Sequence, residues 1–343
     1  MKKINFIGNY LDVLRVLSAS MVVLFHLKLL EVGPPALLRR LPGFGHEFVI
    51  VFFVLSGYVI SWSADRKRGT LGLFALDRAA RILSVSIPLL LLSTAVSAAL
   101  SMGDSLQMVE ALFANLVFLG QSWGIDSFPA SNPPFWSLNY EVWYYVVFGC
   151  AYYLRGKTRV VACILACALA GPRVLLLLPC WLLGAAIYFA PQKLGRAAGV
   201  VAVASVLVLL ALSALKVGAR IVNPATGFEL GQSRTYVKDW VTAFFVAVHI
   251  YAVRHFTFRM PEWFSTAATR GAAVTFTLYL VNYPMILIAK SVFGHASATL
   301  ACTLLAVVLV CCCTWLLAML TEAHTKRVRD WMIARASGPT TAT

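Results

Sequence analysis

Residues 82–100 read ILSVSIPLLLLSTAVSAAL, nineteen residues without a charged side chain. A helix needs about 20 predominantly apolar residues to cross the hydrocarbon core of a bilayer. Five further segments meet the same criterion, namely 11–30, 135–153, 197–217, 272–291 and 297–320. Three shorter apolar segments are also candidates, at 48–62, 174–190 and 238–253, and the segment 160–172 is marginal. Together they predict an all-α fold, a polytopic transmembrane helical bundle of about ten spans embedded in a lipid bilayer.

The composition supports a membrane protein and argues against a soluble enzyme or a disordered chain. Of the 343 residues, 60% are hydrophobic and 13% are charged, whereas a soluble domain averages about 45–50% and 25%. The formal net charge of +15 would suit a nucleic-acid binder only if it lay on a polar surface, so we expect no nucleic-acid partner. In a membrane protein, excess Lys and Arg indicates cytoplasmic loops.

The charge distribution also predicts the orientation. If segment 108–120 does not cross and the ten others do, 19 of the 29 Lys and Arg residues lie on the cytoplasmic side and eight lie outside. Both termini are then cytoplasmic, and 108–120 becomes a re-entrant or interfacial helix on the outer side. We expect one membrane domain over 1–335, a short disordered tail at 336–343, and a multi-pass protein of a bacterial inner membrane.

The cysteines indicate neither disulfides nor a metal site. None lies in a CxxC pair or at zinc spacing from a histidine, so we predict no bound metal. Free cysteines in apolar runs usually pack in the core. The eight are Cys150, Cys163, Cys167, Cys180, Cys302, Cys311, Cys312 and Cys313.

Three ionisable residues interrupt the first apolar segment, namely Asp12, Arg15 and His26. Such groups are costly inside a bilayer and often mark functional sites. Arg15 and His26 are eleven residues apart, which places them on one helix face and about 16 Å apart along the axis. The simpler alternative is that Arg15 reaches lipid phosphates and His26 only packs.

Glu141 lies about two turns into segment 135–153, at an expected depth similar to that of His26. A carboxylate that orients an imidazole helps to make it a general base. The alternative is an ion pair that closes the bundle.

Arg78 and Arg81 lie on one face of the helix that leads into 82–100, near the expected level of Arg15. Arginines bind phosphate bidentately. The alternative is that some of these basic residues only reflect the excess of Lys and Arg on the cytoplasmic side of a membrane protein.

Five motifs, in family order, resemble the acyltransferase-3 family of integral-membrane O-acyltransferases. They are Arg15 with His26 after ten residues, FFVLSGY at 52–58, the basic segment 74–83 with Arg78 and Arg81, Trp136-Ser137-Leu138 with Glu141, and YLVNYP at 279–284. The resemblance covers most of the chain. It implies transfer of an acyl group from cytoplasmic acyl-CoA to a hydroxyl of a cell-surface or exported glycan.

Carried over to this sequence, the resemblance assigns roles to individual residues. The co-substrate is acyl-CoA, with acetyl-CoA the expected form, and no cofactor is bound. Arg15, Arg78 and Arg81 bind the phosphates of the donor. His26 acts as general base or carries the acyl group, and Glu141 orients His26 or balances its charge. The supporting residues are Asp12, which is expected to pair with Arg15, Trp136 and Ser137.

The sequence departs from the family pattern in three places. Asn282 occupies a position where many members have histidine, so we assign Asn282 no catalytic role. Ser84 replaces a proline that usually follows the basic segment. The chain resembles the stand-alone form, without the C-terminal esterase-like domain that some members carry.

A transporter of a glycan or a lipid-linked saccharide is the competing interpretation, because intramembrane charges also mark transport paths. The sequence shows neither the inverted repeat nor the paired broken helices typical of many transporters. A structural or sensory membrane protein would leave Arg15, His26 and Glu141 unexplained. The sequence leaves the identity of the acceptor and the oligomeric state open.

Overall fold

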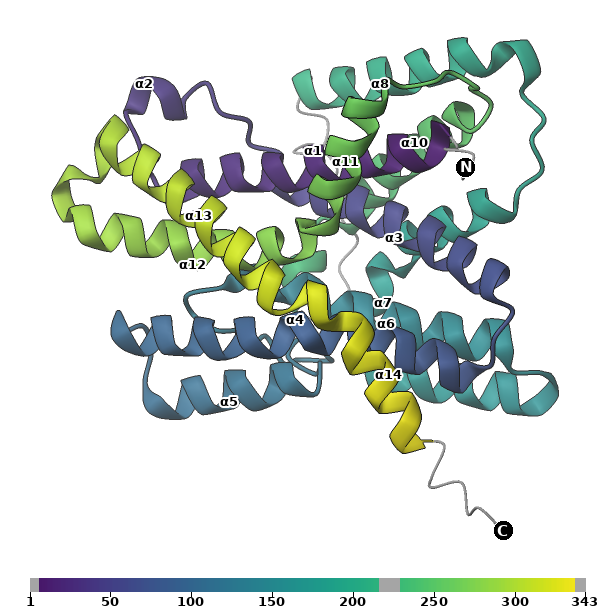
Figure 1. Cartoon of the computed structure of the whole chain (residues 1–343), viewed down its shortest axis with the longest axis horizontal. Coiled ribbons are helices and arrows are strands. Elements are labelled where there is room, and N and C mark those ends of the chain that lie inside the picture. The colour runs from purple at the N-terminus through teal and green to yellow at the C-terminus, as the bar shows by residue number, and fades with distance from the viewer. Residues whose placement is uncertain (1–5, 216–228, 337–343) are drawn as a thin grey trace.

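The computed structural model describes residues 6–215 and 229–336, and its regular elements there are all helical (Figure 1). The α-helices are α1 (Phe6–Leu29), α2 (Pro35–Leu38), α3 (Gly45–Lys67), α4 (Leu71–Ala99), α5 (Ser105–Leu116), α6 (Trp136–Tyr153), α7 (Gly156–Phe189), α8 (Ala198–Ala214), α10 (Tyr236–Val253), α11 (Glu262–Ala273), α12 (Thr275–Phe293), α13 (Leu300–Leu320) and α14 (Thr325–Ala336). Five short 3-10 helices join them, at Pro133–Phe135, Gly195–Ala197, Gly231–Ser233, Gly294–Ala298 and Glu322–His324.

Eight helical segments of the described chain are long and apolar enough to cross a membrane, which confirms the all-α polytopic bundle. They contain α1, α3, α4, α7, α8, α10, α12 and α13. The expected number was about ten. The helix α7 merges two expected segments, and the backbone between them breaks at Gly171, where φ is 80°. The helix α6, which carries Asn139 and Glu141 and is rich in Tyr and Trp, is not among the eight.

Segment 108–120 falls largely on α5, which starts three residues earlier. Asp104 caps this helix by accepting a hydrogen bond of 2.8 Å from the backbone N–H of Gln107. The helix is 12 residues long, or about 18 Å at 1.5 Å per residue. It is therefore too short to cross a bilayer, and it packs against α4.

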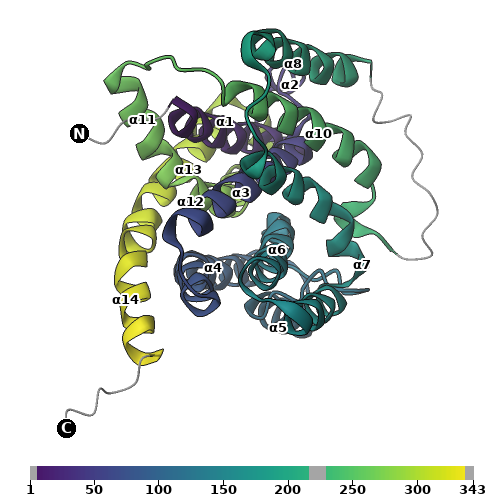
Figure 2. The same cartoon turned by 90° about the vertical axis from the view of Figure 1, so that its right-hand side faces the viewer.

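Side-chain contacts join the end of α7 to the end of α3, and the start of α4 to α3 and α14. Tyr188, at the end of α7, donates a hydrogen bond of 2.8 Å to Asp65, at the end of α3. Asp77, near the start of α4, forms ion pairs with Lys67 of α3 and Arg329 of α14. Figure 2 shows α14 extending from the C-terminal end of α13 beside α4. Helix α14 was not predicted, and it includes Ala336, the first residue of the expected tail. Residues 337–343 lie outside the described residues.

Two glycines hold α3 and α7 in close contact. A Cβ atom at Gly57 of α3 would collide with the Trp181 carbonyl, and one at Gly184 of α7 would collide with the Val54 carbonyl. Small residues allow such close backbone approach between membrane helices. The contact fixes the position of Ser56, which directly precedes Gly57 on α3. Ser56 accepts a hydrogen bond of 3.2 Å from the Trp181 indole.

Most buried apolar side chains form one large core, and a small second cluster contains Ala202, Ala252 and Val253. Many exposed positions on the outer helices are also apolar. Helices α8 and α13 expose Val200, Leu207, Leu304 and Leu316, among others. An apolar exterior is what a bilayer requires of a membrane helix. Inside, α1 packs against α3 and α12, while α4 and α6 pack against each other. These five helices surround the cavity described next.

Candidate active site

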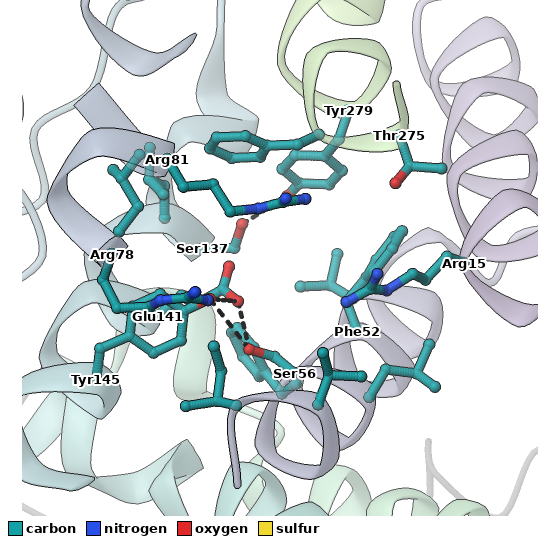
Figure 3. A pocket seen from close by; sticks show the side chains of 18 of the residues that line it. Arg15, Phe52, Ser56, Arg78, Arg81, Ser137, Glu141, Tyr145, Thr275 and Tyr279 are labelled. Atoms are coloured by element: carbon teal, nitrogen blue, oxygen red, sulfur yellow. Dashed lines mark hydrogen bonds between the residues drawn. The ribbon is translucent and has the colours of Figure 1, made fainter. Parts of the chain in front are cut away.

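A cavity of about 240 Å³ lies between α1, α3, α4, α6 and α12 (Figure 3). Five of the eight residues predicted to form the site line it, namely Arg15, Arg78, Arg81, Ser137 and Glu141. The structure therefore brings together residues separated by up to 126 positions in the chain. His26, Asp12 and Trp136 are not part of its lining.

The three arginines come from two helices, and Figure 3 shows their guanidinium groups directed into the cavity. Arg15 extends from α1, while Arg78 and Arg81 extend from adjacent turns of α4. None of the three forms an ion pair with another described residue. The Nε atom of Arg78 is also buried without a hydrogen-bond partner. Arg15 and Arg78 are partly buried and Arg81 is exposed, so the cavity lining presents positive charge without a neutralising ion-pair partner among the described residues.

Glu141 is the single carboxylate among the residues that line the cavity. Ser56 and Tyr145 each donate a hydrogen bond of 2.5 Å to its Oε1 atom. The Oε2 atom makes no hydrogen bond within the described part of the chain and is not among the buried atoms without a partner. One oxygen is therefore fixed by the protein, and the other is available to a ligand. With three arginines and one carboxylate, the formal charge of the lining is positive.

Ser137 and Trp136 are adjacent in sequence but differ in position. Ser137 donates a hydrogen bond of 2.8 Å to the hydroxyl of Tyr279, which also lines the cavity. The Trp136 indole is buried and stacks on His46, with ring centroids 5.6 Å apart and an interplanar angle of 14°. His46 in turn contacts the buried carboxylate of Asp239 at 3.0 Å. Ser137 thus belongs to the cavity, whereas Trp136 supports the helix that carries it.

His26 does not pair with Glu141, which corrects the predicted arrangement. Its Nδ1 atom lies 2.5 Å from Oδ1 of Asn282. The reason is the depth of Glu141. Gly45 of α3 packs against Phe25, the neighbour of His26, whereas Glu141 is bonded to Ser56, eleven residues further along α3. Eleven helical residues span about 16 Å, so Glu141 lies near the level of Arg15, about three turns from His26.

Asp12 also has a partner that the sequence did not indicate. It accepts a hydrogen bond of 2.9 Å from the Thr269 hydroxyl of α11. The expected ion pair between Asp12 and Arg15 is not among the ion pairs of the described residues. Asp12 therefore connects α1 to α11, and the Arg15 guanidinium remains available to the cavity.

Sequence reasoning missed four residues of this region, namely Ser56, Tyr145, Tyr279 and Asn282. Ser56 and Tyr279 lie inside quoted motifs, and Tyr145 follows Glu141 by one helical turn, a spacing that places both on one face. Asn282 was noted only as a departure from the family pattern. Its contact with His26 connects residues 256 positions apart, and helical periodicity does not predict such pairs.

The comparison with protein families agrees with this architecture. A family model described as an acyltransferase domain matches residues 9–319. Among curated proteins and among solved structures, no significant match was found. The matched range includes every residue of the cavity lining as well as His26 and Asn282. A match over nearly the whole chain, with the motif arginines, Ser137 and Glu141 gathered around one intramembrane cavity, shows that this multi-pass membrane protein belongs to the acyltransferase-3 family.

Proposed function

We propose that the protein transfers an acyl group, acetyl in the expected case, from cytoplasmic acyl-CoA to a hydroxyl of a cell-surface or exported glycan. It would do so in the inner membrane of a bacterium. The observation that carries the proposal is the set of three arginines, without ion-pair partners among the described residues, that faces one cavity with a single carboxylate.

The arginine cavity is the proposed donor site. Phosphate groups of acyl-CoA would accept charge-assisted hydrogen bonds from Arg15, Arg78 and Arg81. The unpaired Nε of Arg78 supports this assignment because a bound phosphate would supply its missing acceptor. The free oxygen of Glu141 would accept an N–H or O–H of the same ligand. Glu141 is thus proposed as a donor-site residue instead of a partner of His26.

His26 is proposed to act on the acceptor. The acceptor hydroxyl oxygen would attack the thioester carbonyl carbon, forming a C–O bond as the C–S bond breaks. The hydroxyl proton would pass to the imidazole, and the CoA thiolate would leave and take up a proton as free thiol. His26 and Arg15 share α1 and are about 16 Å apart. This separation suits acyl-CoA because its phosphates and its thioester lie at opposite ends of an extended arm.

A covalent version of the step differs only in the order of transfer. The imidazole would first take the acyl group from CoA, and the acceptor hydroxyl would then remove it. Incubation of purified protein with labelled acyl-CoA in the absence of acceptor distinguishes the two versions. Label retained on wild-type protein and absent from His26→Ala supports the covalent version. An unlabelled wild type that still transfers the acyl group to added acceptor supports direct attack.

The proposed function is tested by mass spectrometry of surface glycans from matched strains with and without the gene. We expect one glycan species to lose the mass of a single acyl group in the strain without the gene. Purified protein in nanodiscs should release free CoA from acyl-CoA when that glycan is added. Movement of unmodified glycan across the bilayer without consumption of acyl-CoA would instead identify a transporter and overturn the proposal.

A further inference from the structure

The pair formed by His26 and Asn282 lies outside the arginine cavity and is almost completely buried. The exposed fractions are 6% for His26 and 0% for Asn282. The two residues come from α1 and α12, and their Nδ1 and Oδ1 atoms are 2.5 Å apart. Hydrogen bonds inside a membrane bundle have little water to compete with them, so this bond persists. Which of its two atoms is the donor determines where the imidazole proton lies.

The other contacts of Asn282 fix the orientation of its amide. The Nδ2 atom donates to the backbone carbonyl of Leu278 at 3.0 Å and to that of Tyr279 at 2.7 Å. Carbonyl oxygens only accept hydrogen bonds, so the amide NH₂ must face them. A reversed amide would place its oxygen against two other oxygens. The atom that faces His26 is therefore the amide oxygen, and it can only accept.

The accepting oxygen assigns the imidazole proton to Nδ1. A neutral imidazole carries one proton, so Nε2 then has an unprotonated lone pair. The Nε2 atom makes no hydrogen bond with a described residue and is not among the buried polar atoms without a partner. The rings of Phe25 and Tyr283 flank the imidazole, with centroids 5.5 and 5.0 Å away. The ring is thus held from several sides.

We propose that Asn282 is a positioning residue that holds His26 as the Nδ1–H tautomer and presents the Nε2 lone pair to the acceptor hydroxyl. This inference rests on the proposed function, in which His26 takes a proton or an acyl group. The hydrogen bond made by the other ring nitrogen sets which nitrogen of a histidine is free to react. An amide performs this task without adding a second charge to a buried site.

The same turn of α12 connects His26 to the donor cavity. Tyr279 accepts the Asn282 amide N–H through its backbone carbonyl, and its side chain lines the cavity and bonds to Ser137. A shift of this turn would move the imidazole partner and the cavity wall together. Asn282 therefore aligns the reacting nitrogen with the site that holds the donor.

Nitrogen-15 NMR of histidine-labelled protein in nanodiscs tests the tautomer directly. The chain has six histidines, and the His26 signals are those missing from His26→Ala. We expect wild-type His26 at neutral pH to carry its proton on Nδ1 and none on Nε2. A proton on Nε2, or an equal mixture of tautomers, would overturn the inference without any need for an Asn282 variant.

Kinetics of Asn282→Leu supply the second readout. We expect kcat to fall at least about tenfold, the KM for acyl-CoA to stay unchanged because the arginines are intact, and both His26 tautomers to appear. Asn115→Leu is the matched control, since Asn115 is also buried, donates to the carbonyls of Ala111 and Ser127, and accepts from Asn139. It should leave kcat and the tautomer unchanged.

The possible outcomes separate this inference from the proposed function. A wild type that transfers the acyl group while His26 carries its proton on Nε2 contradicts only the role of Asn282. A wild type with the Nδ1–H tautomer and no consumption of acyl-CoA contradicts only the proposed function. Equal kcat values for Asn282→Leu and wild type would show that the hydrogen bond has no part in the reaction.

Discussion

The Ser56 hydroxyl donates a hydrogen bond of 2.5 Å to Oε1 of Glu141 and thereby joins α3 to α6 inside the arginine cavity. Tyr145 donates to the same oxygen, and the Trp181 indole donates to Ser56. One carboxylate oxygen is thus held by side chains from α3 and α6, and its support extends to α7. In the proposed function, the second oxygen and the three arginines bind the donor.

Removing the Ser56 hydroxyl should loosen Glu141. A hydrogen bond to a charged group contributes about 1.5–3 kcal/mol, so we expect Ser56→Ala to lower kcat/KM for acyl-CoA by roughly tenfold or more. The measurement is initial-rate kinetics with purified protein. Ser63→Ala is the matched control, because Ser63 lines the same cavity but makes no hydrogen bond to Glu141. Equal losses in both variants would contradict the role given to Ser56.

Replacing a cavity arginine should weaken donor binding. Arg78→Ala removes a guanidinium that would bond to phosphate, so we expect the Kd for acyl-CoA to rise about tenfold or more. Arg78→Lys should recover part of this loss because it restores the charge without the bidentate geometry. Isothermal titration in nanodiscs gives the Kd. The control is Arg270→Ala, at an exposed position on α11, and a similar loss there would contradict specific binding in the cavity.

A methyl group added at the contact between α3 and α7 should destabilise the bundle. At Gly57 an added methyl group meets the Trp181 backbone, and overpacking of this kind costs about 1–3 kcal/mol. We expect Gly57→Ala to lower the midpoint of thermal unfolding, measured by tryptophan fluorescence or light scattering. Gly199→Ala of α8 is the control, since nothing lies within 4 Å of the Cβ position there. An unchanged midpoint for Gly57→Ala would show that the backbones do not touch.

The sequence was sufficient to predict the helical bundle and five of the residues that line the cavity. Apolar runs reveal membrane helices because the bilayer imposes their length, and Arg78 and Arg81 share a face because helical spacing is regular. The predicted depth of Glu141 was wrong because helix tilt and register depend on packing. Here Glu141 bonds to Ser56, eleven residues beyond the position of α3 that packs against Phe25.

The contacts between distant segments were also beyond reach. The partner of His26 is Asn282, which lies 256 residues later in the chain. Asp77 binds Arg329 of α14, a basic helix that was not predicted from the sequence because it lacks a long apolar run. Contacts between residues so far apart in sequence depend on which helices pack side by side. A single sequence carries little information about helix packing.

The most direct test of the central claim compares the release of CoA by wild type and His26→Ala when acyl-CoA and the acceptor glycan are both present. Donor binding, measured in the same samples, should be equal because His26 does not line the arginine cavity. We predict that wild type releases CoA and acylates the glycan, and that His26→Ala binds the donor but transfers at least about a hundredfold more slowly. Full transfer by His26→Ala would contradict the account.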